Sequence, residues 1–306
     1  MPLDLKSRIY KAQCFGNVEP IEHMVPYPNL RALIDGQNIK YGKKLVYSDH
    51  GLTSDIVYAM AQQTANWLVS LGLKSTDRVL VSQLPYPQNE ILAFGIWTLG
   101  ASMVLTGDND LDGAALASSP SLVIDSNMDY FKKIKKFSKN YEPTYKPLLA
   151  DEAMVFWEHK KGIKLSHYNL LVNANGIQHA IDLFENQTFN INIKPNSMAW
   201  VILQAILPLY TGAPLTSTNP DIKIGIEEGD FRIKFQWEKL EKTNPPSLFI
   251  LNENTSFISV NKTAIHLTGL DNNNKPSKIT GHSVMMGYLD DELNDKVFNN
   301  NSLNII

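Results

Sequence analysis

The chain has 306 residues, enough for about two domains of ordinary size. Hydrophobic residues make up 43% and charged residues 19%, so a large core is possible and an intrinsically disordered chain is excluded. Because 28 basic side chains stand against 31 acidic ones, the net charge is −3, which argues against a general nucleic-acid binder. The single cysteine, Cys14, excludes an internal disulfide framework and a cysteine-rich metal site, and we expect a semi-buried thiol.

The apolar segments give no sign of a membrane span. The first ten residues have no basic region leading into an apolar stretch, so we expect no signal peptide. The most apolar run, residues 198–215, is interrupted by Gln204, Pro208 and Gly212 and is shorter than the roughly 20 apolar residues of a membrane helix. We therefore expect a cytoplasmic protein without a membrane span or lipid anchor.

Strand-like and helix-like segments alternate in the first half of the chain. Short apolar runs predict strands at residues 44–48, 78–82, 102–106 and 121–125. Apolar residues at helical spacing predict helices at residues 53–71 and 88–99. Thr53 is the expected N-cap, and Gly72 and Gly100 are the expected stops. This order predicts a parallel sheet covered by helices, with ligands bound near the loops 83–88 and 107–110.

The second half of the chain predicts another α/β unit and a small β-rich end. We expect strands at residues 151–157, within 222–235 and at 247–251, and helices at 165–184 and 237–243. Ser166 is the expected cap of the first of these helices, and the Asn-rich residues 294–304 are expected to fray. The predicted division of the chain is 1–145, 146–255 and 256–306. The fold class is therefore α/β, with two doubly wound, mostly parallel subdomains and a small β-rich C-terminal part.

A run of five lysines in residues 132–139 has two interpretations. A solvated helix face explains it most simply, and binding of an acidic partner is the alternative.

Common catalytic motifs are not present in the sequence. Neither GxxxxGK[ST] nor GxGxxG occurs, and residues 281–285 (GHSVM) fail the GxSxG pattern at the last position. No HExxH pattern occurs, and the seven histidines are scattered.

The most unusual segment is residues 157–170, WEHKKGIKLSHYNL, which places several charges between a predicted strand and a predicted helix. A turn at His159, Lys160, Lys161 and Gly162 could direct backbone N–H groups and lysine side chains toward one point, which is how an anion site is built. A solvated basic turn without a ligand remains the alternative for these residues.

The string KGIKLSHYNLL (residues 161–171) resembles the end of the phosphate-loop motif of the AMP-binding, adenylate-forming superfamily. That superfamily includes acyl-CoA synthetases, aryl-CoA ligases, luciferases and the adenylation domains of peptide synthetases. Residues 45–106, 206–216, 235–252 and 270–298 resemble further segments of the same family in the same order. The resemblance implies the fold of the large N-terminal domain and, in active members, activation of a carboxylate with ATP and Mg²⁺ before transfer to a thiol such as CoA.

The chain also departs from the family pattern. The family's phosphate loop is rich in Ser, Thr and Gly, whereas residues 157–160 (WEHK) contain neither glycine nor hydroxyl, and Glu158 would repel a triphosphate. The aromatic-Gly-x-Thr-Glu motif has no match between residues 215 and 270, and the Thr-Gly-Asp motif has none in the expected order. The smaller C-terminal domain with its catalytic lysine has no counterpart before residue 306.

Three functions remain open from the sequence. The first is a truncated, catalytically degenerate relative of the acyl-CoA synthetases that binds an acyl or nucleotide-like ligand or a partner protein. The second is an active ATP-dependent carboxylate ligase with a rebuilt phosphate loop, in which His159, Lys160 and Lys161 contact phosphate and another chain supplies the C-terminal domain. The third is an unrelated binding or structural protein whose likeness to the family is accidental. ATP, Mg²⁺ and CoA are implied by the resemblance alone, and no metal ligands can be named.

Overall fold

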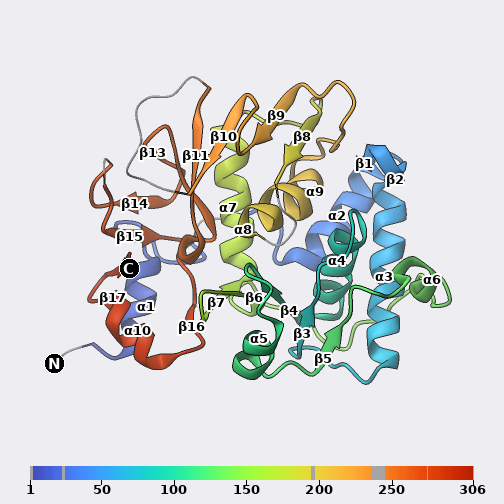
Figure 1. The fold of residues 1–306 in the computed structure, drawn as a ribbon, viewed down its shortest axis with the longest axis horizontal. Coiled ribbons are helices and arrows are strands. Elements are labelled where there is room, and N and C mark those ends of the chain that lie inside the picture. The colour runs from blue at the N-terminus through green and yellow to red at the C-terminus, as the bar shows by residue number, and fades with distance from the viewer. Residues whose placement is uncertain (1–2, 23–24, 194–196, 236–244, 274, 306) are drawn as a thin grey trace.

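A mostly parallel sheet forms the centre of the first half of the chain (Figure 1). Within the residues that the computed structural model describes, 3–22, 25–193, 197–235, 245–273 and 275–305, this sheet has the order β16-β7-β6-β4-β3-β5. The strands are β3 (Arg78–Val81), β4 (Ser102–Thr106), β5 (Leu122–Ile124), β6 (Glu152–Glu158), β7 (Lys161–Ser166) and β16 (Gly287–Tyr288). Strands β5, β3, β4 and β6 are parallel, and β7 and β16 continue the sheet in antiparallel pairing.

Helices cover both faces of this sheet. In β4, Met103 and Leu105 pack in one buried cluster with α4 (Gln88–Leu99), whereas Val104 packs in another cluster with α5 (Leu111–Ser118). Because alternate side chains of a strand point to opposite faces, both sets must be apolar. This explains why the strands are continuous apolar runs in the sequence, and it confirms the predicted sheet.

The two long helices of the first half begin and end close to the predicted residues. Helix α3 (Ser54–Ser70) has Thr53 at its N-cap position, although the Thr53 hydroxyl donates to Asp55 and not to the helix backbone. Helix α4 ends at Gly100, whose φ of 88° is the left-handed conformation that glycine adopts readily. At Gly95 a Cβ would lie 2.1 Å from Cγ2 of Thr64, so a glycine is needed for α3 and α4 to pack this closely.

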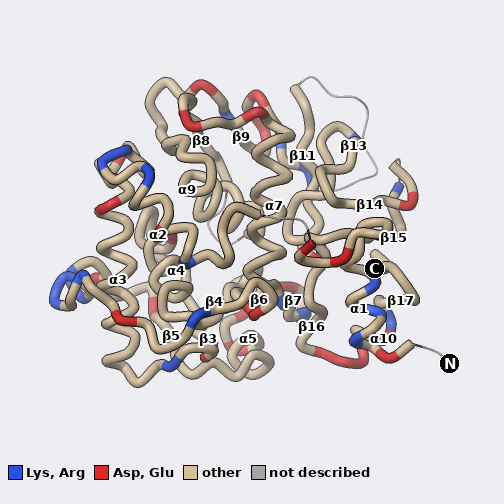
Figure 2. Tube along the Cα trace, turned by 180° about the vertical axis from the view of Figure 1, so that it is seen from behind, with Lys and Arg blue, Asp and Glu red and all other residues tan. Residues whose placement is uncertain are grey.

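Smaller elements surround these helices: α2 (Leu30–Tyr41), β1 (Leu45–Tyr47), η1 (Ser48–His50), β2 (Leu52–Thr53) and α6 (Tyr130–Ile134). The five lysines of residues 132–139 are exposed and form the blue group beside α3 in Figure 2. Their solvated position is confirmed, and an acidic partner remains a prediction.

The second sheet repeats the pattern of the first. In the described part of the chain its order is β13-β12-β11-β10-β9-β8, with β8 to β11 parallel and β12 and β13 antiparallel. The strands are β8 (Phe189–Asn192), β9 (Ile222–Gly225), β10 (Phe231–Lys234), β11 (Ser247–Leu251), β12 (Ser256–Val260) and β13 (Thr263–Ala264), and the 3₁₀ turn η4 (Asn252–Asn254) follows β11. The strands predicted within 222–235 and at 247–251 are confirmed. The helix predicted at 237–243 lies outside the described residues.

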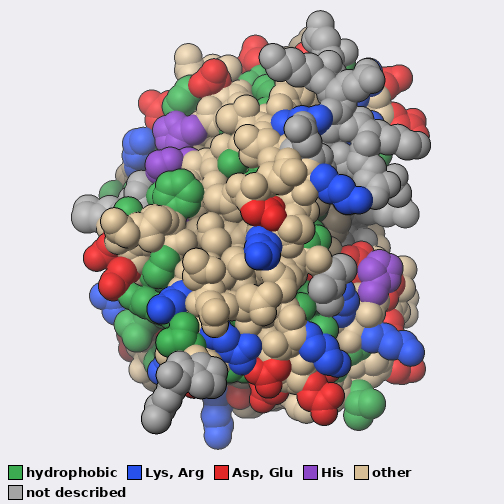
Figure 3. Space-filling view, turned by 90° about the vertical axis from the view of Figure 1, so that its left-hand side faces the viewer, with side chains coloured by type: hydrophobic (Ala, Val, Ile, Leu, Met, Phe, Trp, Pro, Cys, Tyr) green, Lys and Arg blue, Asp and Glu red, His purple; other side chains and the backbone are tan. Residues whose placement is uncertain are grey.

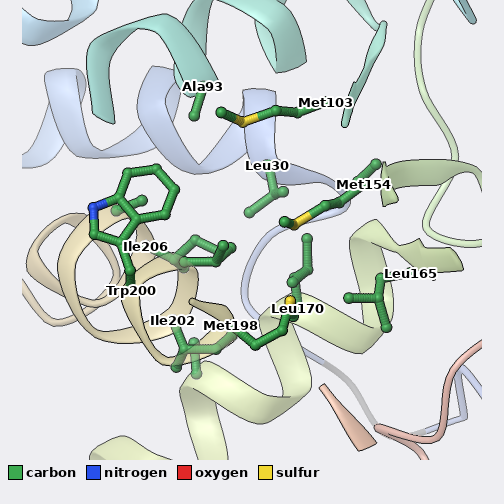
Figure 4. Packing of buried hydrophobic residues seen from close by; sticks show 14 of the residues in the cluster. Leu30, Ala93, Met103, Met154, Leu165, Leu170, Met198, Trp200, Ile202 and Ile206 are labelled. Atoms are coloured by element: carbon green, nitrogen blue, oxygen red, sulfur yellow. The ribbon is translucent and has the colours of Figure 1, made fainter. Parts of the chain in front are cut away.

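The helices of the second half pack against both sheets. They are α7 (His167–Ala180), α8 (Met198–Trp200), the π-helix η2 (Val201–Ile206) and α9 (Leu207–Thr211). Figure 4 shows Trp200 and Ile206 from this region close to Leu30, Ala93, Met103 and Met154. These side chains belong to one buried cluster, so a continuous core joins the first sheet to the helices that follow it.

A small antiparallel sheet forms the end of the chain and packs on α1 (Leu5–Gln13). Its order is β14-β15-β18-β17, from β14 (Thr268–Leu270), β15 (Lys278–Gly281), β17 (Phe298–Asn299) and β18 (Ser302–Asn304). Helix α10 (Asp291–Val297) precedes β17, and Asn294 is buried, with its side chain accepting from Tyr288 N–H at 2.6 Å. The expected fraying of residues 294–304 is therefore wrong, because residues 294–297 belong to α10, β17 and β18 pair with each other, and β18 also pairs with β15. Both strands contact α1.

The architecture confirms two mostly parallel α/β units followed by a small β-rich part. The boundaries at 145 and 255 stay a prediction, and strands from all three predicted parts share the first sheet. None of the helices in the described residues is long and apolar enough to cross a membrane. On the face shown in Figure 3, basic and acidic side chains are interspersed.

Candidate functional site

The segment predicted as a basic turn forms a tight hairpin between β6 and β7. Glu158 pairs with Lys161, so His159 and Lys160 alone make the turn, with φ of 50° and 61°. Residues 161–166 form β7, and the helix predicted from residue 165 begins instead at His167. Ser166 is its cap as predicted, because its hydroxyl accepts from Asn169 N–H at 3.0 Å.

A carboxylate already accepts a hydrogen bond from a backbone N–H at the tip of this hairpin. His159 N–H donates to Oδ2 of Asp108 at 3.0 Å, and the Trp157 indole donates to Oδ2 of Asp110 at 3.0 Å. The hydrogen bond from Trp157 lowers the pKa of Asp110, and the Gly113 N–H and the charge of Lys160 add to this. The His159 N–H and the Trp157 indole N–H are therefore satisfied by carboxylates of the protein itself.

The side chain of Lys161 turns toward a second acidic group. Its Nζ lies 4.0 Å from Oε1 of Glu253 and 6.0 Å from the centre of the Tyr288 ring. The Tyr288 hydroxyl donates to the same Glu253 oxygen at 2.7 Å. Lys161 therefore contributes to a polar contact between β7, η4 and β16, whereas Lys160 is exposed at the tip.

Glu158 lies at the last position of β6, between the two groups of acids. Its Oε2 accepts from Asn252 Nδ2 at 2.7 Å. Burial raises the pKa of the Glu158 carboxyl, and the charges of Asp108 and Glu253 raise it further, against His159 and the Asn252 hydrogen bond. Among the described residues at the hairpin, two lysines thus lie near four carboxylates, so acidic groups outnumber basic ones. The carboxylates are those of Asp108, Asp110, Glu158 and Glu253.

Gly162 serves packing in this structure. A Cβ at this residue would lie 2.4 Å from Cδ1 of Leu289, and the Gly162 carbonyl accepts from Leu289 N–H at 2.7 Å. The glycine lets the segment after β16 pack closely on β7. The four residues predicted as an anion site are therefore contiguous at one hairpin, and their role in binding stays a prediction.

A crevice lies at the carboxyl ends of β3 and β4, where the strand order places a ligand site. Its volume is about 560 Å³, and its polar lining includes Ser82, Gln83, Thr106, Asn109 and Ser126. The loops predicted at 83–88 and 107–110 both contribute to this lining, whereas residues 159–162 do not. Among the described residues we find no group of three or more His, Cys, Asp or Glu side chains arranged to hold a metal ion.

Sequence reasoning missed part of the acidic cluster. Asp108 and Asp110 follow a predicted strand directly, so their position near a strand end could be anticipated. Asn252 and Glu253 come from η4, almost a hundred residues further along the chain. No local pattern marks these two residues, because only the folded topology brings η4 to the hairpin.

The turn geometry predicts the effect of one substitution. A two-residue hairpin turn with positive φ at both positions favours glycine, and each non-glycine residue there costs about 1 kcal/mol. We expect Lys160→Gly to raise the free energy of unfolding by up to about 1 kcal/mol in urea titrations. Lys139→Gly, at an exposed residue outside this turn, is the control. A destabilised Lys160→Gly variant would contradict the hairpin.

The fold is that of adenylate-forming enzymes. No protein-family model matches the sequence, and the search of curated proteins gives no significant match. Solved structures do match: O-succinylbenzoate coenzyme A synthetase (MenE) from Bacillus subtilis has a TM-score of 0.74 and 13% identity, over 90% of this chain and 75% of that one. At this identity the likeness establishes the fold and leaves the activity open.

Two further structures show which part of such enzymes the chain resembles. The Klebsiella oxytoca NpsA N-terminal subdomain, in complex with 3-hydroxyanthranilyl-AMSN, matches with a TM-score of 0.73 and 14% identity, over 90% of this chain and 94% of that subdomain. The N-terminal domain of FACL13 from Mycobacterium tuberculosis matches with a TM-score of 0.69 and 13% identity, over 90% and 95%. The described architecture is therefore that of the large N-terminal domain.

Proposed function

We propose that the chain is a non-catalytic, acyl-CoA synthetase-like protein that binds an acyl or nucleotide-like ligand, or a protein partner, without forming an adenylate. The observation that carries the proposal is the β6–β7 hairpin. Its turn contains only His159 and Lys160, and Asp108 already accepts from the His159 N–H. A two-residue turn is too short to surround the phosphates of ATP as a glycine-rich loop does.

Electrostatics supports the same proposal. A triphosphate at the hairpin would lie near Asp108, Glu158 and Glu253, and like charges a few ångströms apart in a partly buried site repel by several kcal/mol. Lys161 cannot compensate fully, because its ammonium already lies beside Glu253. Mg·ATP should therefore bind weakly or not at all.

The test is calorimetric titration of the purified protein with ATP, AMP and CoA, each with and without Mg²⁺, together with an ATP–pyrophosphate exchange assay. We expect no saturable binding of Mg·ATP and no exchange. Tight Mg·ATP binding with adenylate formation by the chain alone would overturn the proposal.

A charge variant tests the physical reason. The triple variant combines Asp108→Asn, Glu158→Gln and Glu253→Gln. It removes these acidic neighbours of the hairpin lysines, so weak binding of inorganic triphosphate should appear. Asp291→Asn and Glu292→Gln on α10, combined with Glu227→Gln at an exposed residue, also remove three negative charges and are the control for net charge. Equal triphosphate binding by all proteins would show that repulsion at the hairpin is not the cause.

The open crevice beside β3 and β4 supports a second candidate, an active ligase whose C-terminal domain is supplied by another chain. In that case Lys160 and Lys161 would contact phosphate. Lys161→Ala should then lower the rate of adenylate formation in the reconstituted pair, and an unchanged rate would reject this candidate.

A further inference from the structure

A large cavity lies where the last turns of α2, α7 and α9 come together. Helix α9 packs against both α2 and α7, and residues 184–186, which follow α7, complete the wall (Figure 1). The volume is about 790 Å³, which is within the range of small-molecule sites. Neither the β6–β7 hairpin nor the crevice at the carboxyl ends of β3 and β4 contributes a residue to the lining, so this is a separate site.

Two tyrosine–amide pairs lie side by side in the wall of this cavity. Gln37 Nε2 donates to the Tyr27 hydroxyl at 2.5 Å, and Asn175 Nδ2 donates to the Tyr210 hydroxyl at 3.1 Å. The two tyrosine rings contact each other edge to face, with their centres 6.1 Å apart. Gln37 and Tyr210 are only 2% and 7% exposed, so the surrounding core fixes the position of both pairs.

Each pair leaves one hydrogen-bond donor and one acceptor. An amide N–H can only donate, so each tyrosine oxygen accepts and its own O–H is left to donate. The amide oxygen is left to accept, and Gln37 Oε1 is buried without a hydrogen-bond partner in the described part of the chain. Turning an amide around exchanges the two roles and again leaves one donor and one acceptor. A ligand hydroxyl group, which both donates and accepts, is complementary to such a pair.

The charged side chains at the cavity pair with each other. Lys40 Nζ lies 3.2 Å from Oε2 of Glu185, and the Tyr41 hydroxyl donates to the same oxygen. The ammonium of Lys44, which lies nearby, donates to the Glu185 carbonyl. Among the described lining residues, neither charged side chain is therefore without a partner. A phosphate or carboxylate would have to compete with Glu185, so a neutral ligand is favoured.

Further polar and aromatic groups line the cavity on other sides. Gln178 on α7 and Asn186 in the loop after it add two amides, and Phe184 in the same loop is 42% exposed. Polar groups therefore surround the ligand space instead of lying along one edge. A planar base carries its polar groups in one plane, whereas a sugar carries hydroxyls around its ring and has a C–H face that can pack on an exposed aromatic ring.

We infer that this cavity binds a neutral saccharide of the size of a disaccharide. Its hydroxyls pair with Tyr27 and Gln37 and with Tyr210 and Asn175, and the C–H face of one sugar ring packs on Phe184. This site does not require that the hairpin bind or exclude nucleotides, so failure of either proposal leaves the other standing.

The experiment is saturation-transfer NMR followed by calorimetric titration with maltose, cellobiose, lactose and N,N′-diacetylchitobiose. We expect saturable one-to-one binding of at least one of these disaccharides and no binding of adenosine. The per-O-methylated form of the disaccharide that binds should not bind, because its ether oxygens cannot donate hydrogen bonds.

Matched variants locate the ligand. Tyr27→Phe and Tyr210→Phe keep the rings and remove one hydroxyl each, so each should weaken binding by about two- to tenfold, and the double variant by on the order of tenfold or more. Tyr10→Phe, at an exposed tyrosine elsewhere, should not change the affinity. Phe184→Ala should weaken binding, whereas Leu116→Ala, at another exposed apolar residue, should not. Circular dichroism checks that each variant is folded.

Three results would overturn the inference. They are no saturable binding of any of these disaccharides, equal affinity for the per-O-methylated form, and disaccharide binding that the double tyrosine variant does not change. Saturable binding of adenosine in place of a disaccharide, weakened by the same double variant, would assign the cavity to a nucleobase instead.

Discussion

Replacing Trp200 by alanine is expected to lower the free energy of unfolding by about 3–5 kcal/mol. The indole is fully buried at the end of α8, directly before the π-helix η2, among side chains from α2, α4 and the first sheet (Figure 4). Its Nε1 donates to Oε1 of Glu90 at 2.7 Å. The substitution therefore leaves a large cavity and also removes one of two side-chain donors to a buried carboxyl group.

Trp200→Phe separates these two effects. It keeps most of the ring volume but removes the N–H donor, so we expect a smaller loss of about 1–3 kcal/mol. Urea unfolding followed by circular dichroism measures both variants. If Trp200→Phe were as stable as the wild type, the hydrogen bond to Glu90 would contribute nothing, and a loss below about 1 kcal/mol for Trp200→Ala would contradict the packing.

The helices and parallel strands of the first half could be predicted because their signals are local. Helix α4 begins and ends at the predicted residues, since its apolar spacing is unbroken from Gln88 and Gly100 supplies a left-handed stop. The strands of the first sheet are buried on both faces, so an apolar run is all that is needed to recognise them. Here the local preference and the tertiary environment agree.

The hairpin shows where local reasoning fails. The segment KGIKLS is short and half apolar, and such runs fit a strand or the start of a helix equally well. Its pairing with β6 on one side and β16 on the other decides for a strand. Local reasoning fails in the Asn-rich tail for the same reason, because β18 forms by pairing with β17 and with the more distant β15.

Residues that carried the family resemblance make structural contacts in this protein. Asn169 accepts from Ser166 N–H at 3.0 Å, and its Nδ2 donates to the carbonyls of His282 and Val284, at 3.0 Å each. His167 accepts from Leu30 N–H at 3.3 Å through Nδ1. These contacts join β7 and α7 to distant segments. A motif of this kind can therefore indicate the fold correctly without indicating the reaction.

The pH dependence of stability should contain two opposing contributions from buried groups. Burial raises the pKa of Glu90 from 4.5 to about 7, although its own backbone N–H, Trp200 and Gln204 oppose the shift. Burial also lowers the pKa of His167 from 6.5 to about 4, against the charge of Asp151. Each group therefore binds protons differently in the folded and unfolded chains, and stability must change with pH in the interval between its two pKa values.

The two contributions have opposite signs. Between pH 4.5 and about 7, the folded chain keeps the Glu90 proton that the unfolded chain loses, so stability falls as pH rises. Between pH 6.5 and about 4, the unfolded chain takes up a proton on His167 that the folded chain refuses, so stability falls as pH drops. Each contribution is on the order of 3 kcal/mol, at about 1.4 kcal/mol for each pKa unit. In the shared interval they largely cancel in the wild type.

Single variants should separate the two contributions, which largely cancel in the wild type. Glu90→Gln keeps an acceptor for Trp200 and Gln204 but cannot ionise, so its stability relative to the wild type should rise by on the order of 3 kcal/mol from pH 4.5 to 7. His167→Asn keeps an acceptor for Leu30 N–H, and its relative stability should fall by a similar amount from pH 4 to 6.5. Urea unfolding at closely spaced pH values measures both differences, in which other titrating groups cancel. Parallel curves for Glu90→Gln and the wild type would show that Glu90 titrates alike in the folded and unfolded chains, and the buried carboxyl would then be hydrated within the core.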